Sequence, residues 1–577
     1  MKQTKITLLT LATIVVLGLM SCSKESFDVN DNPNAATDST MEYKFILPSA
    51  QNNTGRIVAR SWGWLQNYMG YWARSGTYAP NAQEETYNIT TGFQTGIWSG
   101  LYDNLMDYQL MQIQAKKSNA VFYQGIARIM KAHDFALLVD IYGNVPYSDA
   151  LKGAGSPTPK YDNGAVIYKD LLRQIDTAIV LIKSADESEA GPDASLVTND
   201  IMFGEKLFPG ATIADMKTRW IQFANTMKLR ILTKCMNGGV EDNVDGSIGS
   251  QPKYQAPGFN EAELHIEIDS INAEGTGFLD FDAQVQPGYA SDKGNPFYNL
   301  YVKDNTGTAT SSSVYYKANS YAVGQGTQAD GGYYGYDFDI RRLLFYSRNG
   351  SGVLRGVEYG LPASTDNAAT TLAGIGAGLY GGYDQAQLLL TAAESYFLQA
   401  ECIQRGFSVG NGDAGVTLTD AINASHVTLF VRYGLDEATA LQYSDAYITG
   451  NAGYPDVDIT SIGDLDQDGN PDPGAAVGGL FTIISQKWFA LNGIAPFEVW
   501  SDYRRVDISA TTNHFVYGEG AGFTAGPAIS VYPANSKTEI PVRLLYPQTE
   551  YQYNAANVGA QPSAGAYPFA HIFWDLN

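Results

Sequence analysis

The chain has 577 residues, of which 44% are hydrophobic and 17% are charged, a balance typical of globular proteins long enough to bury a large core. Lysine and arginine number 37 against 60 aspartate and glutamate residues, so the formal net charge is -23. This excess of acid argues against a broad basic surface, and therefore against nucleic acid or anionic lipid as a partner.

The first 40 residues carry the features of an export signal. Two lysines precede an apolar run over residues 6–20, which suits the core of a signal peptide and is shorter than the roughly 18 residues of a spanning helix. The run ends just before Cys22, in a pattern similar to a bacterial lipobox. We therefore predict a lipoprotein signal peptide over residues 1–21, lipidation of Cys22 and a polar tether over residues 22–40. The alternative is an ordinary secretory signal with an incidental cysteine.

The stretch 121–149 predicts the helix around which the first half of the chain is arranged. Its apolar residues recur three to four positions apart, and three alanines within it allow a neighbouring helix to come close. Gly143 and Pro146 are expected to end it, because glycine tolerates the left-handed cap and proline cannot continue the hydrogen-bond ladder. The same spacing predicts helices over residues 41–51, 56–71, 96–116, 165–185 and 218–236.

Between residues 238 and 384 the sustained helical period is lost. Gly, Asn, Ser, Tyr and Asp dominate, with short alternating runs such as residues 263–268. We predict a loop-rich insertion that contains short strands. Because long loops inside a compact protein are uncommon unless they are functional, we expect the binding residues here or in the tyrosine-rich loops that face it.

Three groups of aromatic and polar residues are candidates for ligand contact. A sugar offers an apolar C–H face and a rim of hydroxyls, so it is bound by flat rings with amide, carboxylate or guanidinium groups beside them. The alternative for each group is that its rings pack a glycine-rich loop onto the core. The groups are Trp72, Arg74 and Tyr78; Tyr289, Asp292, Asn295 and Tyr298; and Tyr333, Tyr334, Tyr336 and Asp337.

Helical spacing resumes after the insertion. It predicts helices over residues 387–405, 417–433, 436–447, 480–492 and 497–505. Alternating alanine and tyrosine on helix pairs closed by glycine is similar to tetratricopeptide packing, although the spacing is too irregular for a strict repeat. The predicted fold is therefore mainly α, with tetratricopeptide-like helix pairs. We expect a single domain over residues 41–577, whose helical frame covers residues 41–237 and 385–510.

An aspartate-rich segment reproduces much of a calcium-binding loop. Oxygen-bearing side chains occupy alternate positions, namely Asp464, Asp466, Asp468, Asn470 and Asp472. Gly469 permits the sharp turn, but Ala475 stands where an EF-hand has its bidentate glutamate, so a true EF-hand is not expected. Two interpretations stay open: a structural calcium ion that stiffens the loop, and a plain Asp-Gly turn with solvated carboxylates.

The sequence carries no signature of a nucleophile elbow, phosphate loop, zinc-protease helix or paired-cysteine metal site. The five histidines are widely separated, and each is interpreted as structural. Cys235 and Cys402 lie within apolar helical patterns, which favours buried free thiols over a disulfide or a nucleophile. Nothing singles out a pair of acids for glycoside hydrolysis. We therefore predict that the protein is not an enzyme and requires no cofactor.

A series of short motifs runs in order along nearly the whole chain. The motifs are the lipobox at Cys22, residues 28–33, residues 128–146 with an Ile-Tyr-Gly-Asn-Val-Pro turn, residues 219–225, 393–401, 486–488, 500–505, 540–543 and 546–547, and Phe-Trp-Asp at 573–575. Their order is more specific than any one of them. Together they resemble the SusD/RagB family of outer-membrane nutrient-binding lipoproteins of Bacteroidetes, in its SusD-like branch.

This resemblance implies an α-helical fold, exposure at the cell surface and a SusC-like TonB-dependent transporter as the partner. We expect a lipid-anchored outer-membrane protein that captures a glycan and passes it to the transporter without transforming it. The RagB part of the family name implies a peptide ligand as the alternative, and a surface glycoside hydrolase is a less favoured one. Four charged residues of the matching motifs are interpreted as ion pairs between helices rather than an active centre: Glu394, Glu401, Arg504 and Arg505.

Overall fold

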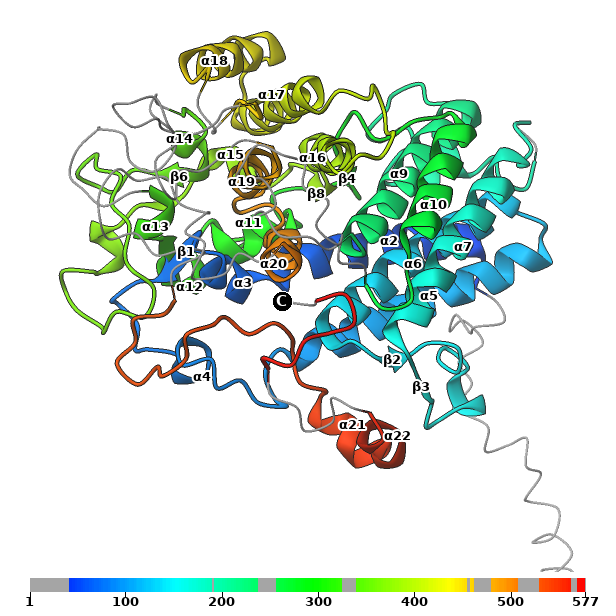
Figure 1. The fold of residues 1–577 in the computed structure, drawn as a ribbon, viewed down its shortest axis with the longest axis horizontal. Helices are drawn as coiled ribbons and strands as arrows, with labels where there is room; N and C mark the ends of the chain where they lie inside the picture. Colours follow the sequence, from blue (N-terminus) through cyan, green and yellow to red (C-terminus); the bar gives the residue numbers. More distant parts are fainter. Residues whose placement is uncertain are drawn as a thin grey trace, which may run out of the picture. The chain divides into compact units, whose positions relative to one another are not determined.

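Helices supply most of the regular structure, and the strands are short (Figure 1). The computed structural model describes residues 41–188, 191–236, 256–323, 339–453, 457–460, 479–506, 529–561 and 568–575. Contacts within Tyr43–Asn577 form one compact unit. The predicted fold class, mainly α with tetratricopeptide-like helix pairs, is confirmed.

Helix α6 (Val121–Tyr142) packs against both of its sequence neighbours, α5 (Thr95–Lys117) and α7 (Gly164–Lys183). The contact with α7 is close because Gly125 lacks a side chain: a Cβ there would lie 2.6 Å from Cγ1 of Ile182. The helix ends at Gly143, whose φ of +80° is one that glycine adopts without strain. The predicted stop is confirmed.

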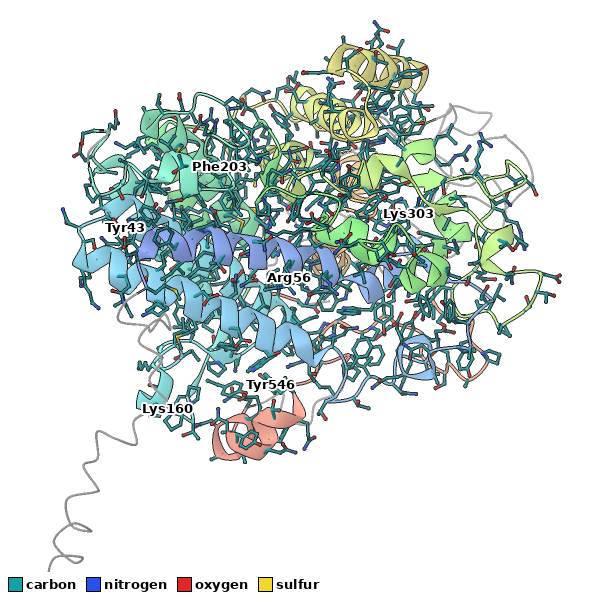
Figure 2. All side chains as sticks on the ribbon, turned by 180° about the vertical axis from the view of Figure 1, so that it is seen from behind. Tyr43, Arg56, Lys160, Phe203, Lys303 and Tyr546 are labelled. Atoms are coloured by element: carbon teal, nitrogen blue, oxygen red, sulfur yellow. The ribbon has the colours of Figure 1, made fainter. Side chains whose placement is uncertain are left out.

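Two further long helices complete the first half of the frame. Helix α2 (Tyr43–Arg60) runs beside α5, as Figure 2 shows with Tyr43 and Arg56 marking its length, and α9 (Ile213–Lys234) packs against α7. The sequence predicts helices over residues 41–51 and 56–71, and therefore a break between residues 51 and 56. The structure has two helices here, but the predicted position of the break is wrong: α2 continues to Arg60, and α3 (Gly63–Tyr68) follows it. Gln51 and Thr54 hydrogen-bond Asp200 and Tyr108 at 2.8 and 2.9 Å, and these tertiary contacts hold α2 together through its asparagines and glycine.

The second half of the frame repeats consecutive helix pairs. Its helices are α16 (Ala392–Gln404), α17 (Ala414–Tyr433), α18 (Glu437–Gly450), α19 (Leu480–Ala490) and α20 (Pro496–Arg505). Helix α17 contacts both α16 and α18. Phe397 and Ile422 lie in the shared core of this part, which is built from small and large apolar side chains in the manner of tetratricopeptide pairs.

Within the described residues the strands form four antiparallel pairs. They are β1 (Trp72–Arg74) with β5 (Tyr316–Ala318), β2 (Val145–Pro146) with β3 (Tyr161–Asp162), β4 (Ala283–Val285) with β8 (Gln387–Leu390), and β6 (Tyr346–Ser347) with β7 (Gly374–Ile375). The first and third pairs each join one strand of the helical frame to one strand of the predicted insertion. The insertion is therefore fastened to the frame by main-chain hydrogen bonds.

Strand β8 corrects the prediction of one helix over residues 387–405. Its four residues are all buried and pair with β4, and a continuous apolar run is compatible with either a strand or a helix. Thr391 then begins α16, because its side chain accepts a hydrogen bond from the backbone of Glu394.

The insertion also holds a regular helix, α10 (Glu261–Glu274), where the sequence predicted alternating structure. Asn260 and Glu263 form a capping box, and Leu264, Ile268 and Ile271 are buried at helical spacing. The alternating interpretation of residues 263–268 is wrong because the helical period begins at Leu264. None of the described helices is both long and apolar enough to cross a membrane.

Short helices connect the longer elements. They are α3 (Gly63–Tyr68), α4 (Ala82–Glu85), α8 (Leu196–Asn199), α11 (Pro296–Tyr301), α12 (Ser311–Tyr315), α13 (Ser320–Val323), α14 (Arg342–Phe345), α15 (Ala377–Tyr380), α21 (Gln548–Tyr553) and α22 (Ala555–Gly559), with 3-10 turns at Gly153–Gly155 and Ala369–Thr371.

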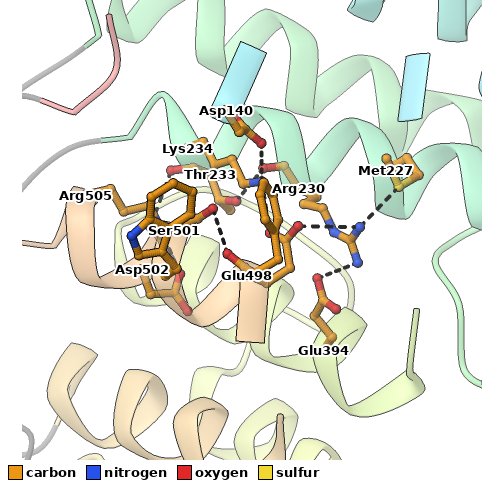
Figure 3. A network of polar contacts seen from close by, with 12 residues as sticks. Asp140, Met227, Arg230, Thr233, Lys234, Glu394, Glu498, Ser501, Asp502 and Arg505 are labelled. Atoms are coloured by element: carbon orange, nitrogen blue, oxygen red, sulfur yellow. Dashed lines mark hydrogen bonds and ion pairs between the residues drawn. The ribbon is translucent and has the colours of Figure 1, made fainter. Parts of the chain in front are cut away.

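A buried network of charges joins helices from both halves of the frame (Figure 3). Arg230 of α9 pairs with Glu394 of α16 at 2.6 Å. Lys234, one turn further along α9, reaches Asp140 of α6 at 2.8 Å and Glu498 of α20 at 2.9 Å. These pairs fix how four helices meet, since each charge left alone in the core would be costly.

The same network continues through α20. Arg505 binds both carboxylate oxygens of Glu401 and also pairs with Asp502 at 2.6 Å. Burial raises the pKa of Glu401, but Arg505 and Arg405 outweigh it and lower the pKa to about 2. Arg504 lies over the rings of Trp500 and Trp574, 3.6 and 4.4 Å from their centroids. The interpretation of Glu394, Glu401 and Arg505 as ion pairs between helices is confirmed.

Candidate functional site

The first predicted group begins with a buried ring. Trp72 lies on β1, is 0% exposed and contacts the rings of Phe297, Tyr301 and Tyr316, the last at 5.4 Å between centroids. A ring enclosed on this scale offers no face to a ligand. The structure therefore corrects the expectation for Trp72, because the strand pairing of β1 with β5 turns its side chain into the core.

Arg74 is also buried, and all of its contacts are within the protein. Its guanidinium forms a two-pronged ion pair with Glu85, and it donates to the carbonyl oxygens of Tyr78 at 2.7 Å and of Leu361 at 2.6 Å. A planar guanidinium suits this arrangement, since its donors are fixed in direction. Arg74 therefore positions the loop that carries Tyr78, and its predicted contact with ligand is corrected to this role.

Tyr78 remains half-buried at the surface, where its ring meets Tyr315 at 5.4 Å with an angle of 56° between the planes. Its hydroxyl donates to the carbonyl oxygen of Ser311 at 3.3 Å. Tyr315 in turn contacts Tyr316 at 4.8 Å, and Tyr316 contacts Trp72. A chain of rings thus runs from the core to two partly exposed tyrosines. We call Tyr78 and Tyr315 the Tyr78 surface.

A buried acid lies near this surface. Glu84 accepts hydrogen bonds from Asn67 at 2.7 Å and from the hydroxyl of Tyr359 at 3.3 Å. Burial raises its pKa, the bond from Asn67 opposes that rise and the neighbouring Glu85 adds to it, so that the pKa reaches about 7. Near neutral pH, Glu84 therefore holds a proton for part of the time.

The residues of the second predicted group differ in how deeply they are buried. Asn295 is 1% exposed and caps α11: its side chain accepts from the backbone of Phe297 and Tyr298 and donates to the carbonyl oxygen of Gln385. Its predicted contact with ligand is corrected, because all these bonds are internal. Tyr289 is 9% exposed, with its hydroxyl 3.4 Å from Asn52, whereas Asp292 is exposed and Tyr298 is half-buried.

The remaining predicted positions lie outside the described residues. These are Cys22, the third group at Tyr333, Tyr334, Tyr336 and Asp337, and the calcium loop at Asp464, Asp466, Asp468, Asn470 and Asp472. Within the ranges that the structure does describe, no three His, Cys, Asp or Glu side chains are grouped as metal ligands.

Cys235, Cys402 and His426 are core residues, with no exposed surface. Cys235 and Cys402 are free and buried, and burial raises the pKa of both thiols, which keeps them protonated and unreactive. The interpretation as buried free thiols is confirmed. Burial, with the charge of Arg341, lowers the pKa of His426 to about 4, so this histidine is neutral at physiological pH.

A small cavity between α2, α11 and the end of α17 is too small for a sugar. Trp62, Tyr301, Gln387 and Arg432 are among its lining residues, and it has room for about one water molecule. The side-chain oxygens of Gln66 and Gln387, which also line it, have no hydrogen-bond partner among the described residues. A bound water is the partner that a cavity of this size admits.

The sequence interpretation missed several surface tyrosines that the structure brings to the predicted ones. Tyr315 joins Tyr78, while Tyr380 and Tyr383 contact Tyr298 at 5.7 and 6.3 Å. Tyr380 and Tyr383 flank two glycines and Tyr315 begins a tyrosine pair, so the same ring-and-glycine texture that marked the three groups could have identified them.

Comparison with known proteins places this fold in a family. The sequence profile of a SusD-like family, described as starch-binding and associating with the outer membrane, matches residues 33–245 and 339–547. These segments cover well over half of the chain. No curated protein sequence matches it.

Solved structures of related fold span nearly the whole chain. A chitin-binding SusD homolog from Flavobacterium johnsoniae is similar at a TM-score of 0.62 and 20% identity, over 93% of this chain and 99% of its own. A SusD homolog from Bacteroides fragilis gives 0.62 and 18% over 93% and 99%, and a SusD/RagB family protein from Bacteroides thetaiotaomicron gives 0.61 and 17% over the same shares. At these identities the likeness concerns the fold. On the evidence of the family profile, the chain belongs to the SusD/RagB family of outer-membrane nutrient-binding proteins.

Proposed function

We propose that this protein is a non-catalytic, cell-surface lipoprotein that binds an oligo- or polysaccharide and delivers it to a SusC-like TonB-dependent transporter. The observation that carries the proposal is the Tyr78 surface: two partly exposed rings in contact, one of them on a loop that Arg74 positions, on a scaffold of the SusD/RagB family. The description of the family as starch-binding, and the likeness in fold to a chitin-binding protein, support a glycan ligand.

The chemistry of the Tyr78 surface suits a sugar. The two rings offer apolar faces to C–H groups, and their inclination of 56° lets them contact two sides of a bent chain. Since Arg74 is fully occupied by internal partners, it brings no free positive charge for an acidic ligand.

The anchor and the calcium loop belong to the same proposal. Acyl chains on Cys22 would hold the domain to the outer membrane, because each buried methylene contributes about 0.8 kcal/mol. A calcium ion bound by the acids of residues 464–472 would stiffen that segment without taking part in a reaction. Both are supported by the sequence pattern alone.

A binding panel tests the ligand class. The full chain in detergent would be titrated with maltoheptaose, chitohexaose and a mixed peptide library, with and without calcium. We expect saturable binding to at least one oligosaccharide. The variants Tyr78→Ala and Tyr315→Ala should each weaken it about tenfold, because a stacked ring contributes on the order of 1 to 1.5 kcal/mol.

Tyr553→Ala is the matched control, since this tyrosine is 76% exposed on α21, outside the Tyr78 surface. If the chain bound only peptides, the ligand would be a peptide rather than a glycan, which is the RagB-like alternative. Shortening of either oligosaccharide would contradict the non-catalytic role.

A further inference from the structure

A second group of tyrosines gathers where three elements meet. Tyr298 of α11 contacts Tyr380 at the end of α15 and Tyr383 in the loop after it, edge to face in both cases. Tyr433, the last residue of α17, follows Arg432, and a Cβ at Gly381, next to Tyr380, would lie 2.7 Å from the carbonyl oxygen of Arg432. Burial, then Tyr298 and Tyr433, raise the pKa of Tyr380. We call these four residues the Tyr298 surface.

The outer rings of the Tyr298 surface are open to solvent. Tyr383 is 43% exposed and Tyr433 is 52% exposed, whereas Tyr298 and Tyr380 behind them are half-buried. Exposed aromatic side chains that lie beside one another are typical of a surface that binds a ligand.

The backbone beneath these rings is held by buried polar side chains. Arg432 is 7% exposed and donates to the carbonyl oxygens of Leu379 and Ala386, at both ends of the loop that carries Tyr383. Asn295 donates to the carbonyl of Gln385 in the same loop, and its own backbone N–H donates to the carbonyl of Tyr383 at 2.6 Å.

Gly381 makes this tight loop feasible. Its φ is +57°, and a Cβ at this position would lie 2.7 Å from the carbonyl oxygen of Arg432. The rings therefore stand on a loop that is fixed before any ligand arrives, which lowers the entropic cost of binding.

The charges beside the rings indicate what kind of ligand fits. Arg432 is buried, and each of its three nitrogens donates to a backbone carbonyl of Leu379 or Ala386, so its guanidinium is directed at the loop rather than at a ligand. The side chain next to Tyr383 is the exposed carboxylate of Asp384. Phenol hydroxyls, ring faces and a nearby acceptor suit a neutral sugar, whereas a sulfated or uronic acid sugar would be repelled.

We propose that the Tyr298 surface is a second glycan-binding site, specific for neutral sugar units, that engages the same polysaccharide as the Tyr78 surface. This proposal rests on the function proposed above. The two surfaces stand on different elements: Tyr78 and Tyr315 belong to the loop after β1 and to α12, and the ring contacts of Tyr298 are made with Tyr380 and Tyr383 instead. Two weak sites on one polymer bind more tightly than either alone, because the second contact becomes intramolecular.

The test compares short and long ligands. Calorimetry with maltoheptaose and chitohexaose counts sites, and electrophoresis through gels containing soluble starch or glycol chitin measures retention by a polymer. We expect the full chain to bind two oligosaccharides and Tyr383→Ala/Tyr433→Ala to bind one, with retention by the polymer reduced at least about tenfold. Tyr383→Phe/Tyr433→Phe, which keeps the rings, should retain most of the binding.

The remaining variants distinguish a failure of the second site from a failure of the proposed function. Tyr78→Ala should weaken the site at the Tyr78 surface about tenfold and leave the site at the Tyr298 surface unchanged, whereas Tyr553→Ala should leave both sites unchanged. If Tyr383→Ala/Tyr433→Ala keeps the stoichiometry and retention of the unaltered chain while Tyr78→Ala weakens binding, the second site is wrong and the proposed function stands. If the unaltered chain binds none of the four glycans, the proposed function itself is wrong.

Discussion

Glu84 holds its proton near neutral pH because its carboxyl group is buried and Arg74 is committed to the neighbouring Glu85. The folded pKa of about 7 exceeds the ordinary value of 4.5, so the folded chain binds this proton more tightly than the unfolded chain. Its contribution to the free energy of unfolding is therefore complete below pH 4.5 and is lost as the pH rises through about 7. The shift corresponds to about 3 kcal/mol.

This predicts a pH dependence that one substitution removes. Glu84→Gln keeps the shape of the neutral acid but has no group that titrates. Between pH 4.5 and pH 8, the free energy of unfolding should therefore fall by about 3 kcal/mol less in this variant than in the unaltered chain. Urea unfolding at several pH values measures it. Glu205→Gln, at an exposed glutamate, should follow the unaltered chain. Parallel profiles for Glu84→Gln and the unaltered chain would refute the account of this acid.

Helices α9, α16 and α20 meet through charged side chains that are at most 6% exposed. Arg505 and Glu401 are 1% and 0% exposed in their side chains, and the pair is closed by two parallel contacts between guanidinium and carboxylate. Removing Glu401 deprives Arg505 of two charge-assisted contacts in the core and leaves it to share Asp502 with Lys487. This loss costs more than the pair contributes over an apolar replacement.

Glu401→Ala should therefore lower the free energy of unfolding by about 3–5 kcal/mol, and the double variant Glu401→Met/Arg505→Met should cost less than this single change. Lys169→Ala is the control, because its pair with Glu263 spans 2.9 Å at an exposed site, where such pairs contribute at most about 1 kcal/mol. Equal effects of Glu401→Ala and Lys169→Ala in urea unfolding would contradict the role of this network.

The elements themselves could be predicted wherever one face of a helix is apolar. Helices α5, α6, α7 and α17 lie within a few residues of their expected positions, since their period of buried residues is visible in the sequence. Strand β8 and the unbroken α2 could not be predicted in this way, because each depends on partners far along the chain, β4 and Asp200. Neither partner is signalled by local spacing.

At the scale of the whole molecule, the candidate site too could be predicted only in part, because the orientation of its side chains depends on partners far along the chain. Composition and glycine-rich texture identified the loops that carry partly exposed tyrosines, and Tyr78 and Tyr298 were among the predicted residues. Which rings turn inward depends on strand pairing and caps, so Trp72 and Asn295 were assigned to the ligand although they hold β1 and α11 in place.

The central claim is that this protein binds a glycan and does not cleave it, and one measurement tests both the binding and the absence of cleavage. The full chain would be equilibrated with end-labelled maltoheptaose and with chitohexaose, the bound fraction followed to saturation, and the chain length of the recovered sugar determined. We predict saturable binding to at least one of them, weakened about tenfold by Tyr78→Ala, with every sugar recovered at its full length. Shortened sugar, or binding that Tyr78→Ala leaves unchanged, would contradict it.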